Sequence, residues 1–333
     1  MPTINTNDYN VYLDISDEFN IVFATLTGLD LVDFDQYVSN LSIITRDSIL
    51  LLWCAVNPIM FDELAILQLN KFYHSIKNPL VIFTGALDID SKFLDFHCTG
   101  INLFQHIAKI SQPQNRSTVL EKSKKYLFMS TKDYLSRRYI LQHLLNNGFK
   151  DQGILAYKCL QKSFNENFGQ NAGYIENACN SIDNQIPIIG FDGPLYNYEQ
   201  VPEPIINDTY LSIITETYYQ GPIFFSEKIY YAMLYNHFFI YLGPQHSLKY
   251  LRSIGFKTFG HIINESYDDI EDPAERLFAV TQAIDDFLKI PLDKLHQLYI
   301  ENIDIINANR QLVGTIDINE IVNSALYVAK SIR

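Results

Sequence analysis

The chain has 333 residues, of which 47% are hydrophobic, and its 38 acidic and 25 basic residues give a formal net charge of −13 at pH 7. This length predicts two domains, and the hydrophobic content is sufficient for a core in each. So acidic a chain lacks the basic footprint that binding to a nucleic-acid backbone requires, and nucleic acid is not an expected partner. The best candidate for a local basic groove is the run Lys122-Ser123-Lys124-Lys125, although such a run is more typical of a solvated lead into a strand.

The cysteines and the apolar runs indicate a soluble, cytoplasmic protein. Cys54, Cys98, Cys159 and Cys179 lie far apart without C-x-x-C spacing, so the sequence predicts neither a zinc site nor a disulfide framework. The apolar run at residues 48–56 is too short to span a bilayer, and no charged leader precedes a long apolar segment.

The first third alternates strand-like and helix-like segments. Residues 48–56 and 80–84 are apolar runs typical of buried strands, and residues 61–76 between them have a helical pattern. This βαβ order predicts a parallel sheet.

A second α/β unit begins near residue 125. Strands are predicted at residues 126–130 and 153–157, with a helix at 134–147 that stops at Asn147-Gly148. Residues 161–205 lose periodicity and are rich in Asn, Gly and Pro, which predicts a long irregular insertion.

The following part of the chain has well-marked element ends. Strands are predicted at residues 210–215 and 238–242, and the second leads through Gly243 to a helix with Ser247 as its N-cap and Gly255 after its end. Asp272-Pro273-Ala274-Glu275 predicts the start of a helix that runs to about residue 289. Two further helical segments are predicted near 292–309 and 317–331.

Two basic groups are candidates for phosphate binding. Ser226-Glu227-Lys228 opens a predicted helix, where free backbone N–H groups and an ammonium group favour an anion, although such a triplet is more often a cap with two solvated charges. Arg137 and Arg138 lie in the first turn of the helix after strand 126–130. One of them is expected to point toward the end of that strand, where a guanidinium could hold a diphosphate; otherwise both are exposed.

The acidic candidates are less distinctive. Asp88-Ile89-Asp90 follows a buried strand and could hold a divalent metal, but so short a pattern is weak in an acidic chain. Asp95 is another possible base, while its neighbour His97 is interpreted as part of an ordinary loop pair. Residues 264–269 either face a cleft or form a solvated loop. No Walker A, G-x-G-x-x-G, G-x-S-x-G or H-E-x-x-H pattern is present.

Three sequence blocks resemble a known family. FFSEKIYYAMLYNHFFIYLGP at residues 224–244 is similar to the donor-binding motif of α-1,3-fucosyltransferases and related GT-B glycosyltransferases. The continuation SLKYLRSIGFKTF…NESYDDIEDPAER resembles glycosyltransferase-like proteins common in phages, large viruses and marine bacteria. In those proteins a strand, a basic and polar loop and a His-Arg pair form an upstream block, matched here by KYLFMSTKDYLSRRYILQHLLNNGFKDQGILAY.

The resemblance implies an α/β protein with two Rossmann-like domains of GT-B type and a cleft between them. Residues 1–120 would form the acceptor domain, and residues 121–333 the nucleotide-sugar domain with extra terminal helices. The implied reaction transfers a sugar from a GDP- or UDP-linked donor to a hydroxyl acceptor, expected to be a glycan. It needs no further cofactor and no metal, because cationic side chains take the metal's place.

Family roles transfer to matching positions. Lys228 and Arg138 would bind the donor diphosphate, Glu227 would bind the ribose, and Ser226, Glu216 and Gly243 would border the same site. Asp88 or Asp95 would serve as the base that deprotonates the acceptor.

The chain departs from the family pattern at several positions. Ser226 replaces the usual threonine, Arg137 replaces the usual histidine, and the loop before Arg137 lacks an expected arginine. Two alternatives therefore stay open: a non-catalytic glycan-binding or structural protein on the same fold, and a transferase acting on modified nucleic acid. The oligomeric state is left open.

Overall fold

The computed structural model describes two compact groups of residues. One unit comprises Met1–His106, Pro222–Phe224 and Asp317–Arg333, and the other comprises Ile107–Gly221 and Phe225–Ile316. The described residues are 21–25, 49–54, 80–84, 97–100, 121–130, 134–157, 168–179, 203–217 and 220–316, together with residues 67, 70, 71, 73, 74, 87, 105, 108 and 327.

The first unit contains a parallel four-stranded sheet in the order β1-β2-β3-β4. Its strands are β1 (Ile21–Thr25), β2 (Ile49–Cys54), β3 (Leu80–Thr84) and β4 (His97–Gly100). The predicted strands at 48–56 and 80–84 are confirmed, whereas β1 and β4 were not predicted. The described residues of the predicted helix at 61–76 are helical. Cys98 in β4 is a free thiol, and burial raises its pKa to about 12.

The second unit is α/β with a Rossmann-like, all-parallel sheet in the order β6-β5-β7-β8. Its strands, β5 (Lys124–Ser130), β6 (Gly153–Tyr157), β7 (Thr209–Thr215) and β8 (Phe238–Leu242), confirm the four strands predicted here. Every residue of β7 and β8 is buried, as expected for parallel strands that are covered on both faces.

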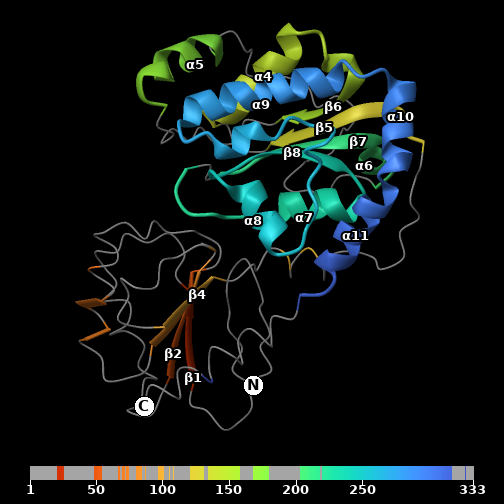
Figure 1. Ribbon diagram of the computed structural model, residues 1–333. Coiled ribbons are helices and arrows are strands. Elements are labelled where there is room, and N and C mark those ends of the chain that lie inside the picture. The colour runs from red at the N-terminus through yellow and green to blue at the C-terminus, as the bar shows by residue number, and fades with distance from the viewer. Residues whose placement is uncertain are drawn as a thin grey trace. The chain divides into compact units, whose positions relative to one another are not determined.

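Helices cover both faces of this second sheet (Figure 1). α4 (Leu135–Asn146), α5 (Ala172–Cys179) and α9 (Pro273–Leu288) lie on one face, and α7 (Glu227–Leu234), α8 (Ser247–Ser253) and α11 (Ile303–Val313) lie on the other. The chain steps from β5 to β6 in one direction and from β7 to β8 in the opposite direction. Because both crossovers are expected to be right-handed, their helices lie on opposite faces.

Local capping chemistry fixes several helix ends as predicted. Asp272 caps α9 by accepting hydrogen bonds from the backbone N–H groups of Ala274 at 2.9 Å and Glu275 at 2.8 Å. Gly148 after α4 and Gly255 after α8 adopt φ values of 72° and 98°, the left-handed conformation that glycine adopts without steric cost.

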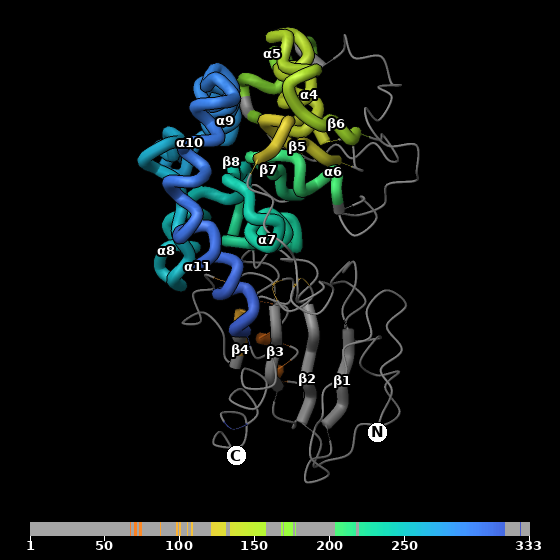
Figure 2. Tube along the Cα trace, turned by 90° about the vertical axis from the view of Figure 1, so that its right-hand side faces the viewer, coloured from red at the N-terminus to blue at the C-terminus, as the bar shows by residue number. Residues whose placement is uncertain are grey.

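Two helical predictions need correction. The segment predicted as one helix near 292–309 is two helices, α10 (Leu292–Glu301) and α11, which follow one another along one side of the unit (Figure 2). Asn302 separates them: its amide nitrogen donates to the Leu298 carbonyl at 2.9 Å, and its amide oxygen lies 2.6 Å from His261 Nε2. The segment 161–205, expected to be irregular, contains α5 and the start of α6 (Glu203–Asn207).

The basic run at 122–125 overlaps the start of β5, and its lysines are bonded to neighbouring segments. Lys122 is only 3% exposed, its ammonium donates to the Asn207 carbonyl at 2.8 Å, and it lies 5.2 Å from the centre of the Tyr299 ring. Burial lowers the pKa of Lys122 to about 7, against the opposing effect of Asp208. Lys125 donates to the Leu288 carbonyl at 2.6 Å. Lys122 and Lys125 thus hold the sheet to its surrounding segments.

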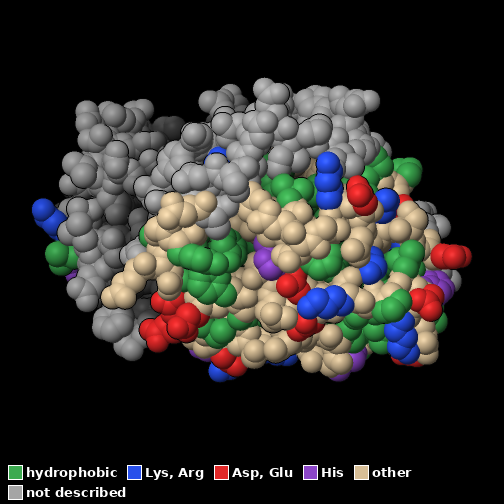
Figure 3. Space-filling view, turned by 90° about the horizontal axis from the view of Figure 1, so that it is seen from above, with side chains coloured by type: hydrophobic (Ala, Val, Ile, Leu, Met, Phe, Trp, Pro, Cys, Tyr) green, Lys and Arg blue, Asp and Glu red, His purple; other side chains and the backbone are tan. Residues whose placement is uncertain are grey.

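The surface of the described residues is mixed in charge. On the face seen in Figure 3, acidic and basic side chains are interspersed with apolar ones. Among the described residues, no helix has the length and apolar character needed to cross a membrane.

Candidate functional site

The carboxyl ends of β5 and β7 mark the place where the strand order reverses. These two strands are neighbours, and the chain leaves them for opposite edges of the sheet. In open α/β sheets, ligands bind outside the carboxyl ends of the strands at such a switch point. The segment that follows β7 is therefore the expected position of a binding site.

Glu216, the first residue after β7, is the centre of a buried polar network. Its Oε1 accepts hydrogen bonds from the backbone N–H of Ser226 at 3.0 Å, the Ser226 hydroxyl at 2.8 Å and the Tyr241 hydroxyl at 3.3 Å. Its Oε2 lies 3.3 Å from the Lys228 ammonium. The Glu216 side chain is 0% exposed, so these four donors supply the partners that a buried carboxylate needs.

Ser226 and Lys228 belong to the first turn of α7. Ser226 is the N-cap, as predicted from the Ser-Glu-Lys triplet, and its hydroxyl accepts weakly from the Lys228 N–H at 3.4 Å. The Lys228 ammonium returns to the same hydroxyl at 3.1 Å and keeps 17% of its side chain exposed. The lysine is thus not a freely solvated charge, because Glu216 and Ser226 hold its ammonium beside the helix start. Glu227 is half-buried.

Arg137 lies on the opposite face of the sheet and reaches the same strand ends. Its guanidinium donates to the Thr215 carbonyl at 3.2 Å, the Thr217 hydroxyl at 3.2 Å and the Ser130 hydroxyl at 3.4 Å, and it lies 4.7 Å from the centre of the Tyr134 ring. Arg137 is 2% exposed. It therefore fulfils the expectation that one of the two arginines points to the end of β5.

Arg138, which the family resemblance assigns to the diphosphate, follows on the same helix. It is half-buried, and its backbone N–H donates to the Tyr134 carbonyl at 2.9 Å. Its assignment to the donor stays a prediction. The sequence did not indicate which of the two arginines is the buried one.

Gly243 gives room to the tyrosine of the network. A Cβ atom at Gly243 would lie 2.1 Å from the Tyr241 ring, so this position requires glycine for close packing. Burial and, secondarily, the nearby Glu216 charge raise the pKa of Tyr241 well above its ordinary value. The phenol therefore stays protonated and donates its hydrogen bond to Glu216.

The start of α8 differs from the prediction. The N-cap position is His246, and Ser247 is the first helical residue, with its hydroxyl donating to the Pro244 carbonyl at 2.6 Å. The capping group is Asp268, whose two oxygens accept from the backbone N–H groups of Leu248 and Lys249, both at 2.9 Å. A residue distant in sequence thus satisfies these amides, which is why local sequence suggested the wrong cap.

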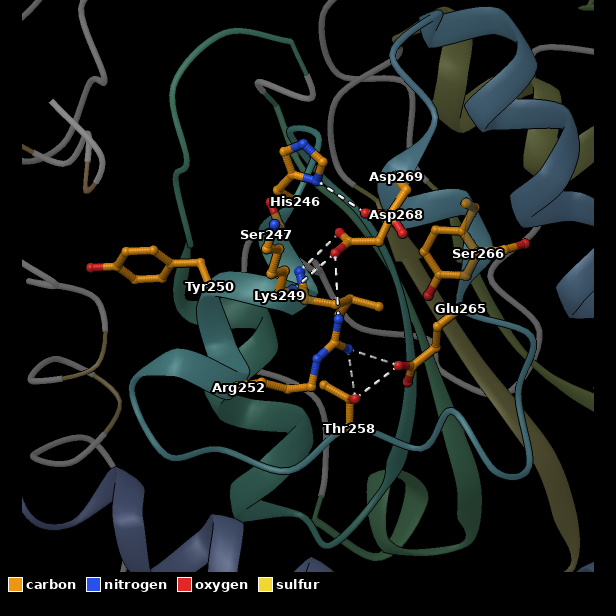
Figure 4. Close-up of polar contacts among 12 residues, drawn as sticks. His246, Ser247, Lys249, Tyr250, Arg252, Thr258, Glu265, Ser266, Asp268 and Asp269 are labelled. Atoms are coloured by element: carbon orange, nitrogen blue, oxygen red, sulfur yellow. Dashed lines mark hydrogen bonds and ion pairs between the residues drawn. The ribbon is translucent and has the colours of Figure 1, made fainter. Parts of the chain in front are cut away.

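The acidic segment at 264–269 is bound into the fold (Figure 4). Arg252 donates to Glu265 Oε2 at 3.0 Å and to the Thr258 hydroxyl at 3.0 Å, and it lies 4.0 Å from Asp268 Oδ2. Glu265 Oε1 also accepts from the Phe259 N–H at 2.7 Å. Burial raises the pKa of both Glu265 and Asp268, while these hydrogen bonds and Arg252 act against the shift. Neither carboxylate is simply solvated, so the expectation of a solvated loop is wrong for these two residues.

The acidic candidates of the first unit lie outside the described residues. This applies to Asp88, to Asp90 and to Asp95, and for His97 only its place in β4 is known. Among the described residues, no group of three or more His, Cys, Asp or Glu side chains is placed to hold a metal ion.

The chain matches no family model, no curated protein and no solved structure. The resemblance to glycosyltransferases therefore rests on the sequence blocks alone.

Proposed function

We propose that this protein is a GT-B-type glycosyltransferase that moves a sugar from a nucleoside diphosphate donor to a hydroxyl acceptor, expected to be a glycan. One observation carries the proposal: the Lys228 ammonium is held next to Glu216 beside the start of α7, at the end of β7 where the strand order reverses. The presence of a parallel four-stranded sheet in each unit supports two Rossmann-like domains.

The donor diphosphate would bind next to the start of α7. A helix N-terminus carries partial positive charge, and an adjacent ammonium adds to it. During transfer, negative charge accumulates on the leaving diphosphate, and fixed cations stabilise that charge. Lys228 and Arg138 would supply this stabilisation, and Glu227, the half-buried first residue of α7, would accept hydrogen bonds from the ribose.

Glu216 would set the position of Lys228 between turnovers. The carboxylate holds the ammonium at 3.3 Å in the unliganded chain, so a ligand must share or replace this partner. A diphosphate with two charged groups can do so more readily than a monoanion, because the gain in Coulomb energy grows with ligand charge. The base that activates the acceptor would come from the first unit, with Asp88 and Asp95 as the candidates.

Binding calorimetry with GDP and UDP tests this function. The wild-type chain is expected to bind at least one of them, with Lys228→Ala and Arg138→Ala each weakening affinity by about ten-fold or more, as expected for a lost charged hydrogen bond. Lys294→Ala is the matched control, since Lys294 is an exposed lysine of α10 that contacts Gln297. Absence of binding to every nucleoside diphosphate would exclude the enzyme proposal.

A non-catalytic glycan-binding protein is the second candidate. The buried Arg137 at the position of the usual histidine favours it, because its guanidinium bonds to the ends of β5 and β7 and stabilises the fold without a ligand. Binding to a glycan array without affinity for any nucleotide would favour this candidate over the transferase.

A further inference from the structure

His246 has a backbone conformation that few residues adopt. Its φ of 65° and ψ of 13° lie in the left-handed region, where a β-carbon is crowded; glycine is the usual residue there, and Asn, Asp and His are the commonest of the others. Asn236 is the other non-glycine residue with positive φ in the described part. The chain thus retains a histidine where glycine would relieve strain, and such outliers concentrate at functional sites.

The surrounding loops fix this conformation. The His246 N–H donates to the Asp268 carbonyl at 2.8 Å, and its own carbonyl accepts from the Tyr250 N–H at 2.9 Å. Gln245 Nε2 donates to the Asp269 carbonyl at 2.8 Å. Together with the cap from Asp268, these bonds join the loop after β8 to the segment before α9 and hold the backbone of His246 in place.

His246 and Asp269 form an exposed pair where these two segments meet (Figure 4). The imidazole Nδ1 lies 3.2 Å from Asp269 Oδ1, and the side chains are 44% and 76% exposed. Nδ1 is a buried atom that makes no hydrogen bond within the described residues, so its contact with Asp269 is an ion-pair contact. The fold therefore leaves the carboxylate oxygens and the second ring nitrogen available to a ligand.

The pair lies at the same edge of the sheet as Lys228. β7 and β8 are adjacent, and the Glu216 N–H donates to the Leu242 carbonyl at 2.9 Å, so the residues following the two strands start side by side. The ring of Phe225, which precedes the Ser226 cap, lies 6.1 Å from the ring of Tyr250 in α8. The residue before the α7 cap therefore packs against the middle of α8.

We propose that His246 and Asp269 bind a vicinal diol of the nucleotide-sugar donor. This inference rests on the proposed function and adds a contact that it does not contain. A carboxylate accepts hydrogen bonds from sugar hydroxyls, and an imidazole nitrogen donates or accepts one, whereas the Asp269 charge disfavours a phosphate at this position. The cations beside Glu216 take the diphosphate, and the pair takes hydroxyls, from either the ribose or the transferred sugar.

The test compares His246→Gly and Asp269→Asn with the wild type in calorimetry against a nucleoside diphosphate, its 2′,3′-dideoxy analogue and the matching nucleotide sugar. His246→Gly removes the imidazole and the steric strain of a β-carbon at positive φ. Its thermal unfolding midpoint is therefore expected to equal or exceed that of the wild type. Both variants are expected to bind the nucleotide sugar about three- to ten-fold more weakly. Asn236→Gly changes the other positive-φ residue, beyond the far end of α7, and is expected to leave affinity unchanged.

The ligands separate the two sources of the diol. Weaker binding of the diphosphate and the nucleotide sugar, without an effect on the dideoxy analogue, assigns the pair to the ribose. A loss confined to the nucleotide sugar assigns it to the transferred sugar. If the wild type binds nucleotides and both variants match it for every ligand, the inference is overturned while the proposed function stands. If the wild type binds no nucleotide, both are overturned.

Discussion

Replacing Glu216 tests whether its carboxylate organises the start of α7. Glu216→Gln keeps the side-chain volume and one carbonyl oxygen, which can still accept from Ser226 and Tyr241, but it places an amide against the Lys228 ammonium at 3.3 Å. Loss of one charged hydrogen bond costs about 1.5–3 kcal/mol. Glu216→Ala removes all four interactions and leaves a charge without its partner, which costs about 3–5 kcal/mol.

The single tryptophan of the chain, Trp53, belongs to β2 of the first unit, so the stability of the second unit calls for other probes. Urea denaturation followed by far-ultraviolet circular dichroism, with hydrogen exchange of the α7 amides, measures the change where it occurs. Glu227→Gln is the control, because it alters the neighbouring residue and removes only a helix-end charge worth about 0.3–1 kcal/mol. A Glu216→Gln variant within about 0.5 kcal/mol of wild type, with unchanged exchange in α7, would show that the carboxylate does not organise this helix start.

Three further changes test other parts of the second unit. Gly243→Ala places a Cβ 2.1 Å from the Tyr241 ring and is expected to lower stability by about 1–3 kcal/mol in thermal unfolding, whereas Gly173→Ala in α5 meets no atom within 4 Å and is expected to be neutral or stabilising; equal effects would contradict the packing argument. Asp268→Ala removes both acceptors at the start of α8 and is expected to cost about 1–3 kcal/mol, with faster exchange of the first-turn amides; unchanged exchange would argue against this cap. Burial lowers the pKa of Lys122 from 10.5 to about 7, so between pH 7 and 9 the unfolded chain holds a proton that the folded chain lacks, and stability is expected to rise by about 2 kcal/mol over this range. Lys122→Met should flatten that rise, and a wild-type stability that does not change over the same range would show that the ammonium stays charged in the fold.

Local signals predicted the second sheet well. Its strands are short apolar runs bounded by polar or glycine residues, and a strand that is buried on both faces needs no more than that. The start of α9 was equally readable, because Asp272 caps amides only two and three residues away. Where the stabilising partner is near in sequence, the pattern that forms the structure is visible in the sequence.

The errors arose where the partner is distant. Asp268 caps a helix whose amide at Leu248 lies 20 residues earlier, and Lys122 is buried because Asn207, 85 residues away, accepts its hydrogen bond. The break at Asn302 depends partly on His261, 41 residues earlier. Periodicity and propensity describe one segment at a time, so contacts between segments are beyond their reach.

The candidate site contains partners of both kinds, near and distant in sequence. The cap at Ser226 and the position of Lys228 followed from the local triplet, while the role of Glu216 as the common acceptor depends on β7 and β8 lying side by side. The choice between Arg137 and Arg138 depends on the rotation of α4 against the sheet, which two adjacent residues in the sequence do not reveal.

A crystal structure with a bound nucleoside diphosphate would decide whether the start of α7 is the donor site. We expect the phosphates to lie beside the first turn of α7, within hydrogen-bond distance of the Lys228 ammonium and outside the carboxyl ends of β5 and β7. A nucleotide bound elsewhere, with Lys228 still held by Glu216 and Ser226 as in the unliganded chain, would contradict the proposed function of this site.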